Sequence, residues 1–431
     1  MKKKISKSLL MTALVTGLCI GGVQGAFAAE DLNTFALDEY VVTATITEKN
    51  LLKVPAVASV ITKEEIQEKN ITTVKEALKG QSGLYIDTSM YESGGIQMRG
   101  FDSKNVLVLF DGQPMNNGWN GEVNWEVIPV EQIERIEVVR GAASSLYGGR
   151  AVGGVINIIS KDLVDKKVTG SATLTYGSNN TWKKAIDVQG KINDKWSFGV
   201  GYENKKSDGY GGKRKAVKTT TGGDDVIGSV TAPQLSANNP SYPGRYVIGG
   251  PGNRATESEN INVSFQYNFD DDKSLKYTFT KSEYEYRYND PFSYVKDANG
   301  NSIFGPGKYQ TQNGQYISLY PGLWLNYVGE NETDIHTFNY KDKKNLWDVN
   351  LGIQDVKKAG YTSTDDDVES LSFNGEGEYA NYPSKNYNLD IQKTWENIGK
   401  HTITVGGNWK DETMDRITYN LSHWKDSDSI I

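Results

Sequence analysis

Alternating apolar and polar positions dominate the second half of the chain. In residues 168–176 the even positions are Val, Gly, Ala, Leu and Tyr and the odd ones Thr or Ser, and residues 261–269 repeat the alternation. A period of two predicts β-strands with one apolar and one polar face. We count nine such strands, near residues 168–176, 182–192, 195–204, 259–269, 274–286, 333–341, 346–356, 385–395 and 401–412.

The connections between these strands alternate in length. Short turns are expected at 193–194, 270–273, 342–345 and 396–400, and long loops at 205–258, 287–332 and 357–384. Tight turns at one end and long loops at the other are typical of a transmembrane β-barrel, whose apolar face meets lipid and whose polar face lines the lumen. A soluble β-sandwich, the alternative, gives no such alternation.

The first half of the chain has shorter, more apolar runs. Residues 57–61, 106–110, 136–139 and 155–159 are β-rich and bounded by turn residues, whereas residues 129–133 and 143–147 have room for only one or two helical turns. Thr62 with Glu65, and Thr73 with Glu76, have the spacing of helix N-caps. These elements predict a compact α+β domain in front of the barrel.

Four segments of this domain resemble the plug domain of TonB-dependent outer-membrane receptors: MRGF (98–101), VLVLFDG (106–112), IERIEVVRG (133–141) and SSLYGGRAVGGVINIISK (144–161). One departure is Ala142, where the family usually has proline. The resemblance implies a fold of an α+β plug followed by a transmembrane antiparallel barrel of about 22 strands. Since only nine strands are counted, we expect the rest of the barrel to be missing from this sequence. The expected domains are a signal peptide (1–28), a periplasmic segment (29–53), the plug (54–163) and the N-terminal part of the barrel (164–431).

The resemblance also implies roles for individual residues. The segment before the plug resembles the TonB box, which would pair as an extended strand with TonB of the TonB-ExbB-ExbD complex; a linker or the first plug strand is the alternative. Arg99 and Arg140 match positions where a buried arginine ties the plug to barrel carboxylates, and an ion pair inside the plug is an equal alternative. The TonB box is assigned to Asp38, Glu39, Tyr40, Val41, Val42, Thr43 and Ala44, and structural plug roles to Arg99, Gly100, Asp111, Gly112, Arg140, Gly141, Tyr147, Gly148, Gly153, Gly154 and Asn157.

Ligand contacts are expected where the order of plug elements puts the apex. The expected contacts are Met90, Tyr91, Glu92, Ser93, Met115, Asn116, Asn117, Trp119 and Asn120. Asparagine and tryptophan at turns have structural roles as often as binding roles, so both interpretations stay open.

The N-terminus predicts export. Four lysines precede an apolar run at residues 9–20, and Ala26-Phe27-Ala28 has the small-x-small pattern of a cleavage site. A membrane anchor is disfavoured by the short run, and a lipoprotein by Leu18 before Cys19. Cleavage of this signal peptide removes four lysines and no acidic residue, so the formal net charge changes from −7 to −11 (−7 − 4). An acidic chain argues against nucleic-acid binding, and the low mean hydropathy of −0.55 with 25 Tyr and 9 Trp suits barrel strands.

No catalytic or cofactor constellation is found. His336, His401 and His423 are scattered, and no nucleophile and base stand in a recognisable arrangement, so an enzyme is not predicted. Residues 365–367 are three consecutive aspartates, which lack the alternating spacing of a calcium loop and make Ca²⁺ a weak candidate. Residues 213–218 form a short basic run, and the loop at 287–332 is rich in tyrosine; solvation and loop packing explain both without a ligand.

The function implied by the resemblance is energy-coupled import of a metal chelate, such as a ferric siderophore, haem or cobalamin, by a monomer in the lipid of the outer membrane. A passive porin-like channel is disfavoured by the plug and the TonB-box segment. A truncated receptor that does not transport, and a ligand-binding or colicin-type surface receptor, remain alternatives because of the missing strands.

Overall fold

The computed structural model describes residues 40–41, 49–50, 57–86, 93–118, 121–141, 144–163, 167–209, 249–250, 253–289, 292–293, 307–310, 316–319, 326–363 and 377–420. Residues 40–431 cluster into one compact unit, and every element below belongs to it. The predicted signal peptide lies outside the described residues. None of the helices in the described ranges is long and apolar enough to cross a membrane.

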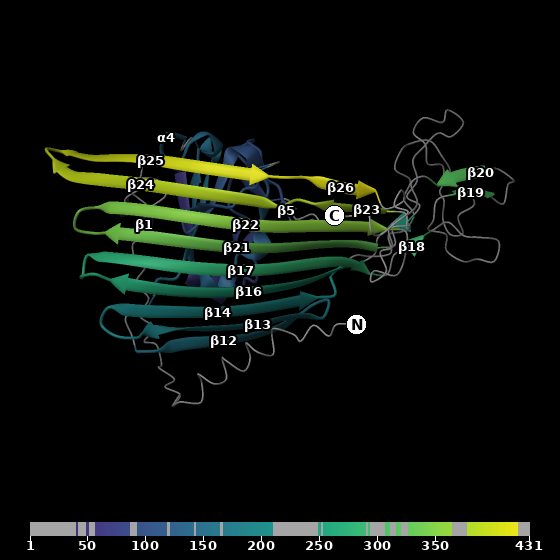
Figure 1. Cartoon of the computed structure of the whole chain (residues 1–431), viewed down its shortest axis with the longest axis horizontal. Coiled ribbons are helices and arrows are strands. Elements are labelled where there is room, and N and C mark those ends of the chain that lie inside the picture. Colours follow the sequence, from purple (N-terminus) through teal and green to yellow (C-terminus); the bar gives the residue numbers. More distant parts are fainter. Residues whose placement is uncertain are drawn as a thin grey trace. The chain divides into compact units, whose positions relative to one another are not determined.

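Residues 57–163 form a small α+β domain, here called the plug, around a five-stranded sheet (Figure 1). The strand order is β3-β10-β11-β7-β8, with β11 and β7 parallel and the other neighbours antiparallel. All five residues of β7 are buried, as a run of Val, Leu and Phe predicts for a central strand. The strands are β3 (Val57–Thr62), β7 (Val106–Phe110), β8 (Gln113–Pro114), β10 (Ile133–Arg140) and β11 (Gly154–Ser160), which confirms the four predicted runs.

The two predicted helix caps are present. Thr62 accepts a hydrogen bond from the Glu65 amide at the start of α2 (Lys63–Glu68), and Thr73 accepts one from the Glu76 amide at the start of α3 (Val74–Leu78). The other short helices are α4 (Ser144–Tyr147) and the 3₁₀ turns η2 (Ser103–Asn105), η3 (Trp125–Val127), η4 (Val130–Gln132) and η5 (Gly149–Ala151).

Several two-stranded ladders complete the described part. In the plug, β4 (Leu84–Ile86) pairs with β6 (Ile96–Met98) and β5 (Ser93–Gly94) with β9 (Val123–Asn124). Elsewhere β1 (Tyr40–Val41) pairs with β2 (Lys49–Asn50), β15 (Gly249–Gly250) with β18 (Phe292–Ser293), and β19 (Gly307–Gln310) with β20 (Tyr316–Leu319).

The largest apolar core lies in the plug, where Trp125 and Phe110 are among its largest fully buried side chains. Ile335 belongs to the same core, although it comes from a strand far along the chain. The plug core therefore includes a side chain from the second sheet, and the two share apolar as well as polar contacts.

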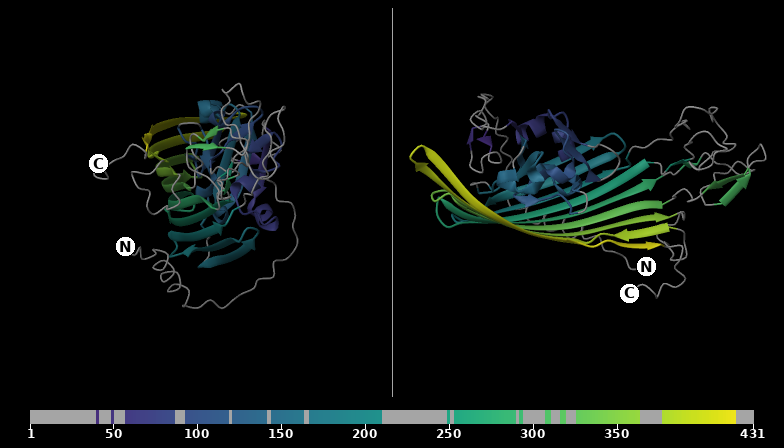
Figure 2. Two further views of the ribbon diagram at one scale, coloured as in Figure 1. Left: turned by 90° about the vertical axis from the view of Figure 1, so that its right-hand side faces the viewer. Right: turned by 90° about the horizontal axis from the view of Figure 1, so that it is seen from above.

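The second half of the described chain forms one antiparallel sheet of eleven strands, here called the long-strand sheet (Figure 1). Figure 2 shows that this sheet is curved. Its strands are β12 (Thr169–Gly177), β13 (Thr181–Lys191), β14 (Trp196–Ser207), β16 (Asn253–Asn268), β17 (Lys273–Asn289), β21 (Asn326–Asp342), β22 (Trp347–Ser363), β23 (Gly377–Asn381), β24 (Ser384–Ile398), β25 (His401–Met414) and β26 (Ile417–Asn420).

All nine predicted strands are present, but several are longer than predicted. β17 and β21 pair as far as Arg287 with Val328, and β22 extends to Ser363, so parts of the predicted long loops are strands. Some outward positions of these extensions carry charges instead of apolar residues, as in the Lys357 to Glu332 ion pair. Hydrophobic alternation therefore stops before the hydrogen-bonded ladder does.

The two faces of the long-strand sheet have opposite chemistry. Its buried positions are mostly polar: Ser197, Asn260, Asn262, Ser264, Thr278, Thr280, Thr333, Thr337, Gln354, Asn386 and Asn388. Its exposed face carries large apolar side chains: Leu174, Trp196, Phe265, Leu275, Phe338, Trp347, Leu351, Ile391, Trp395 and Val405. Trp196, Tyr267, Phe269 and Tyr340 form a chain of ring contacts at the end where the short turns lie. An apolar outer face bounded by aromatics is the pattern of a membrane barrel wall.

Candidate functional site

The plug is fastened to the long-strand sheet by a cluster of charged side chains around Lys183. The Lys183 Nζ lies 3.0 Å from Glu131 Oε1 of the plug and 3.3 Å from Glu203 Oε2 of the neighbouring strand β14. The side chain of Lys183 is only 3% exposed. A buried ammonium needs such carboxylate partners, because an unpaired buried charge is strongly unfavourable.

Further polar contacts continue this attachment along the same plug segment. Gln132 Nε2 donates to Asp187 Oδ2 over 2.9 Å, and Lys205 Nζ lies 3.8 Å from Glu126 Oε2. The Asn260 amide donates to the Glu126 carbonyl. In this plug segment Glu126 therefore contacts β14 and β16, and Glu131 and Gln132 contact β13.

A second attachment lies near the end with the short turns. Asp111 accepts hydrogen bonds from the Ser160 amide (2.8 Å) and hydroxyl (2.6 Å), and Lys276 Nζ of β17 donates to the Ser160 Oγ and the Lys161 carbonyl, both over 3.2 Å. Asp111 and Gly112 have φ values of +48° and +82°, which form the tight turn between β7 and β8. The last plug strand is thus held where the chain passes into the long-strand sheet.

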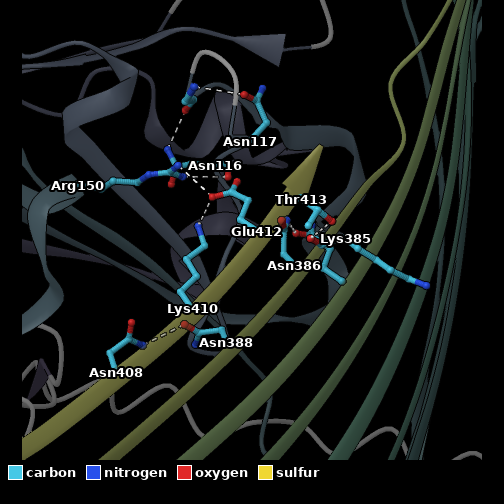
Figure 3. A network of polar contacts seen from close by, with 12 residues as sticks. Asn116, Asn117, Arg150, Lys385, Asn386, Asn388, Asn408, Lys410, Glu412 and Thr413 are labelled. Carbon is cyan, nitrogen blue, oxygen red and sulfur yellow. Dashed lines mark hydrogen bonds and ion pairs between the residues drawn. The ribbon is translucent and has the colours of Figure 1, made fainter. Parts of the chain in front are cut away.

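A third attachment holds plug residues 115–118 (Figure 3). Arg150 Nη2 lies 3.1 Å from Glu412 Oε2 of β25, and its Nη1 donates to the Asn116 carbonyl over 3.4 Å. Lys410 Nζ lies 2.9 Å from the same Glu412 oxygen. Gly118 leaves room for this carboxylate, since a Cβ at Gly118 would lie 2.7 Å from Glu412 Oε1.

These contacts show which plug residues lie near which end of the long strands. Lys276 is close to the start of β17, just after a short turn, whereas Glu412 is close to the end of β25, which begins after a short turn at His401. Residues 115–118 therefore lie toward the end of the sheet where the long connections are, and residues 111 and 160 lie toward the short turns. The role of residues 115–120 as ligand contacts stays a prediction.

The structure places the predicted ligand contacts in different environments. Met90, Tyr91, Glu92, Trp119 and Asn120 lie outside the described residues, and Ser93 begins β5. Met115 and Asn116 are buried. Asn116 is fully engaged by the plug: its Oδ1 accepts from the Val108 amide, and its Nδ2 donates to the carbonyls of Ser103, Val106 and Gly121. These bonds fit the structural alternative for Asn116 and leave Asn117, half-buried, as the described side chain nearest the loop surface.

The two predicted plug arginines lie close together. Arg140 Nε donates to the Ser82 carbonyl over 2.6 Å, and its Nη2 donates to Ser59 Oγ and Gln81 Oε1. Burial, together with the nearby Arg99 guanidinium, lowers the pKa of Arg140. Arg99 has a φ of +51° in the MRGF turn, and its amide donates to the Gly83 carbonyl. The Arg140 contacts given by the structure are neutral groups of the plug, so the tie to barrel carboxylates stays a prediction.

The remaining plug motif residues lie at turns, at close backbone approaches or in the plug sheet and core. Gly154 has a φ of +151°, and a Cβ there would lie 2.3 Å from both the Val139 carbonyl oxygen and Met98 Sδ. A Cβ at Gly153 would lie 2.7 Å from Phe101 Cβ. The other motif glycines, Gly100, Gly112, Gly141 and Gly148, have φ values of +87°, +82°, +109° and +80°, and Asn157 lies in β11 opposite Glu137. Tyr147 packs against Leu107, Leu109, Ala151 and Val155, and burial raises the pKa of its hydroxyl far above the usual range, with a further contribution from Glu137.

Of the TonB-box residues, only Tyr40 and Val41 are described, as strand β1 paired with β2. Asp38, Glu39, Val42, Thr43 and Ala44 lie outside the described residues, as do the aspartates at 365–367. The described ranges contain no group of three His, Cys, Asp or Glu side chains arranged to hold a metal ion.

No motif in the sequence marks the residues that join the plug to the sheet. Arg150 and Glu412 are 262 positions apart, and no local pattern connects them. The ion pairs of Lys183 could have been suspected from the sequence. Lys183 lies on the polar face of a predicted barrel strand, and a buried lysine needs an acidic partner.

Comparison with known proteins agrees with this architecture. Residues 50–155 match the family model for the TonB-dependent receptor plug domain. A vitamin B12 transporter, BtuB, of Vibrio vulnificus is 36% identical over 175 residues, which is 40% of this chain and 28% of that protein. BtuB of Photobacterium profundum is 30% identical over 212 residues, 49% of this chain and 34% of that protein.

Solved structures show the same fold. The ferripyoverdine receptor of Pseudomonas aeruginosa superposes with a TM-score of 0.56 at 12% identity, covering 90% of this chain and 46% of that one. The ferric enterobactin receptor PfeA of the same organism gives 0.51 at 18% identity, covering 83% and 50%. The chain spans about a third of the curated relatives it matches and about half of these structures.

The fold is therefore that of a plug domain followed by part of a β-barrel. Residues 50–155, which form the plug, are similar to the plug domain of TonB-dependent receptors. Its relatives are transport receptors and not enzymes.

Proposed function

We propose that this chain is the plug-bearing part of an outer-membrane receptor that imports a metal chelate with energy delivered by TonB. The observation that carries the proposal is the match of residues 50–155 to the receptor plug; residues 115–118, near the end of the sheet with the long connections, support it. The ligand classes to test are a corrinoid, because the curated relatives are vitamin B12 transporters, and ferric siderophores, because the structural neighbours bind them. Haem is the third class.

The proposed mechanism follows from where the attachments lie. A chelate enters from the side of the long loops and contacts loop 115–121, whose position depends on the Arg150 to Glu412 ion pair. The segment 38–45 pairs by β-augmentation with TonB of the TonB-ExbB-ExbD complex in the periplasm. Force on this segment rearranges the plug, which otherwise stays fastened to the wall by the Lys183 cluster.

The proposed location follows the same logic. Residues 1–28 direct export, the apolar outer face of the long-strand sheet meets lipid, and the short turns face the periplasm. The receptor works as a monomer, and its cargo, not a resident cofactor, brings the metal.

Deletion of residues 38–45 tests the proposal. In cells that carry the gene, uptake of radiolabelled cobalamin, ferric siderophores and haem is measured with and without the deletion, and with and without a proton uncoupler. We expect both treatments to abolish uptake of one chelate, while the exposed plug substitution Lys69→Gln leaves uptake unchanged. Uptake that persists after deletion and uncoupling would instead identify a passive channel.

A further inference from the structure

The outer face of the long-strand sheet contains a cation among apolar neighbours. Lys393 in β24 pairs across the sheet with Trp347 of β22 on one side and Val405 of β25 on the other. Along β24 its same-face neighbours are Ile391 and Trp395. All four neighbours are exposed: Trp347 by 41%, Val405 by 58%, Ile391 by 39% and Trp395 by 43%.

Two indole rings flank the ammonium. Lys393 Nζ lies 5.5 Å from the ring centroid of Trp347 and 5.5 Å from that of Trp395. Both distances are within the range of cation–π attraction, which fixes the ammonium between the rings. Within the described ranges no carboxylate forms an ion pair with Lys393.

Two other outward cations of the described sheet, Lys385 and Lys206, have acidic partners. On the same face of β24, Lys385 Nζ lies 3.4 Å from Asp355 Oδ2, and Lys206 Nζ on β14 lies 3.1 Å from Glu257 Oε2. Those pairs occur toward the long connections, whereas Lys393 lies near the short turn that joins β24 to β25. The positive charge of Lys393 is therefore not paired by a carboxylate of the described sheet and is open to an anion outside the protein.

We propose that Lys393, Trp347 and Trp395 form a binding site for the phosphate group of a phospholipid in the periplasmic leaflet. This inference rests on the proposed placement of the sheet in the outer membrane, with short turns toward the periplasm. A lysine on a lipid-facing strand is strongly unfavourable at the bilayer centre and nearly neutral near the interface, where its ammonium reaches the headgroups. The two indoles suit the same depth, because tryptophan prefers the boundary between acyl chains and headgroups.

The geometry gives each residue a role. The Lys393 ammonium donates charge-assisted hydrogen bonds to the phosphate oxygens, and Trp347 and Trp395 hold the lysine stem and cover the glycerol region. Val405 and Ile391 contact the first part of the acyl chains. The occupant is a phospholipid and not a free phosphate, because the exposed apolar side chains around the cation require an apolar partner.

Native mass spectrometry of the full chain tests the inference. The chain is reconstituted in nanodiscs of phosphatidylethanolamine and phosphatidylglycerol, and the lipids that it retains are counted; affinity for phosphatidylglycerol is then titrated in detergent. We expect Lys393→Met to lose one retained lipid and to weaken the titrated affinity about tenfold. Lys393→Arg should keep the lipid, and Trp347→Leu should weaken the affinity about threefold.

Lys385→Met is the matched control, because it removes a cation from the same strand and face whose partner is a protein carboxylate. It should retain as many lipids as the unmodified chain. Equal retention by Lys393→Met and the unmodified chain, or equal loss in the two lysine variants, would overturn the inference; Lys393→Gln supplies the same comparison if the Met variant does not insert. Lipid retention and lipid affinity involve neither TonB nor a chelate. Failure of this inference can therefore be told apart from failure of the uptake proposal.

Discussion

Arg150 of the plug and Glu412 of β25 form an ion pair of 3.1 Å between Nη2 and Oε2. Their side chains are 33% and 17% exposed, so water screens part of the attraction. The same guanidinium reaches the Asn116 carbonyl, which makes the pair a support for loop 115–121. The interaction joins the surface where a chelate would arrive to the wall that surrounds it.

Removing this ion pair should loosen the loop without unfolding the plug. We expect Glu412→Gln and Arg150→Met each to lower the stability by about 1 kcal/mol or less, as for other partly exposed pairs. In a double-mutant cycle the second substitution should cost less than it does alone. Amide hydrogen exchange of residues 115–121 measures the effect, and additive losses would show that the two side chains act independently.

Gly118 should be sensitive to the smallest side chain. A Cβ at this position would lie 2.7 Å from Glu412 Oε1, so Gly118→Ala must displace the carboxylate and break its contact with Arg150. Faster amide exchange in residues 115–121 is the expected result. Gly149→Ala is the control, because nothing lies within 4 Å of a Cβ there; equal effects of the two substitutions would contradict the steric explanation.

Among the lysines of the described residues, Lys183 should lower the free energy of unfolding most when it is substituted. Lys183→Met leaves Glu131 and Glu203 without their shared cation, and we expect a loss of about 3–5 kcal/mol, as for other broken buried ion pairs. The free energy of unfolding is measured by urea titration in detergent micelles. Lys206→Met, whose ion pair with Glu257 is exposed by 62% and 52%, should change stability by less than about 1 kcal/mol.

Asn116 tests whether a predicted ligand contact is structural. Asn116→Asp keeps the shape but sets a carboxylate oxygen against the carbonyls of Val106 and Gly121, which now accept hydrogen bonds from Nδ2 at 2.9 and 2.8 Å. We expect a loss of at least about 3 kcal/mol in the free energy of unfolding. Asn117→Asp should cost less, since its Oδ1 accepts from the Gly121 amide and a carboxylate can do the same. Unchanged stability with weaker ligand binding in Asn116→Asp would restore the binding role.

Tyr147 should make the plug sensitive to alkaline pH. Burial, with Glu137 nearby, raises the pKa of the folded-state hydroxyl, so the folded plug favours the neutral phenol. This stabilisation is complete below the unfolded-state pKa of about 10 and is lost as the pH rises above it. The unfolding free energy should therefore fall between pH 9 and 11 by more in the unmodified chain than in Tyr147→Phe. Equal slopes would show that Tyr147 does not titrate on unfolding.

The elements that depend on one local rule could be predicted from the sequence. The nine strands were found because a lipid-facing wall needs an apolar side chain at every second position, and the helix starts at Thr62 and Thr73 were found because a hydroxyl caps the amide three residues on. Strand ends were missed where charged residues replace apolar ones, as do Lys357 and Glu332, which pair with each other. A hydrogen-bonded ladder continues there without hydrophobic alternation.

The site was less predictable for a different reason. Asn116 stands at the predicted apex, yet its amide is turned into the plug by backbone partners that only the fold brings together. The Arg150 to Glu412 pair depends on how strands far along the chain curve back to the plug. No spacing in the sequence predicts the contact between Arg150 and Glu412. The Lys183 cluster, in contrast, could be suspected from a lysine on the polar face of a predicted strand.

The three attachments of the plug also differ in when they can form. Gln132 and Asp187 are 55 residues apart, Ser160 and Lys276 are 116 apart, and Arg150 and Glu412 are 262 apart. Closing longer loops costs more entropy and slows folding. We therefore expect the plug to be held first on the side of β13 and β14, and residues 115–118 to gain their support last. The part of the plug that the proposed chelate would contact would then also be the last to reach its final structure.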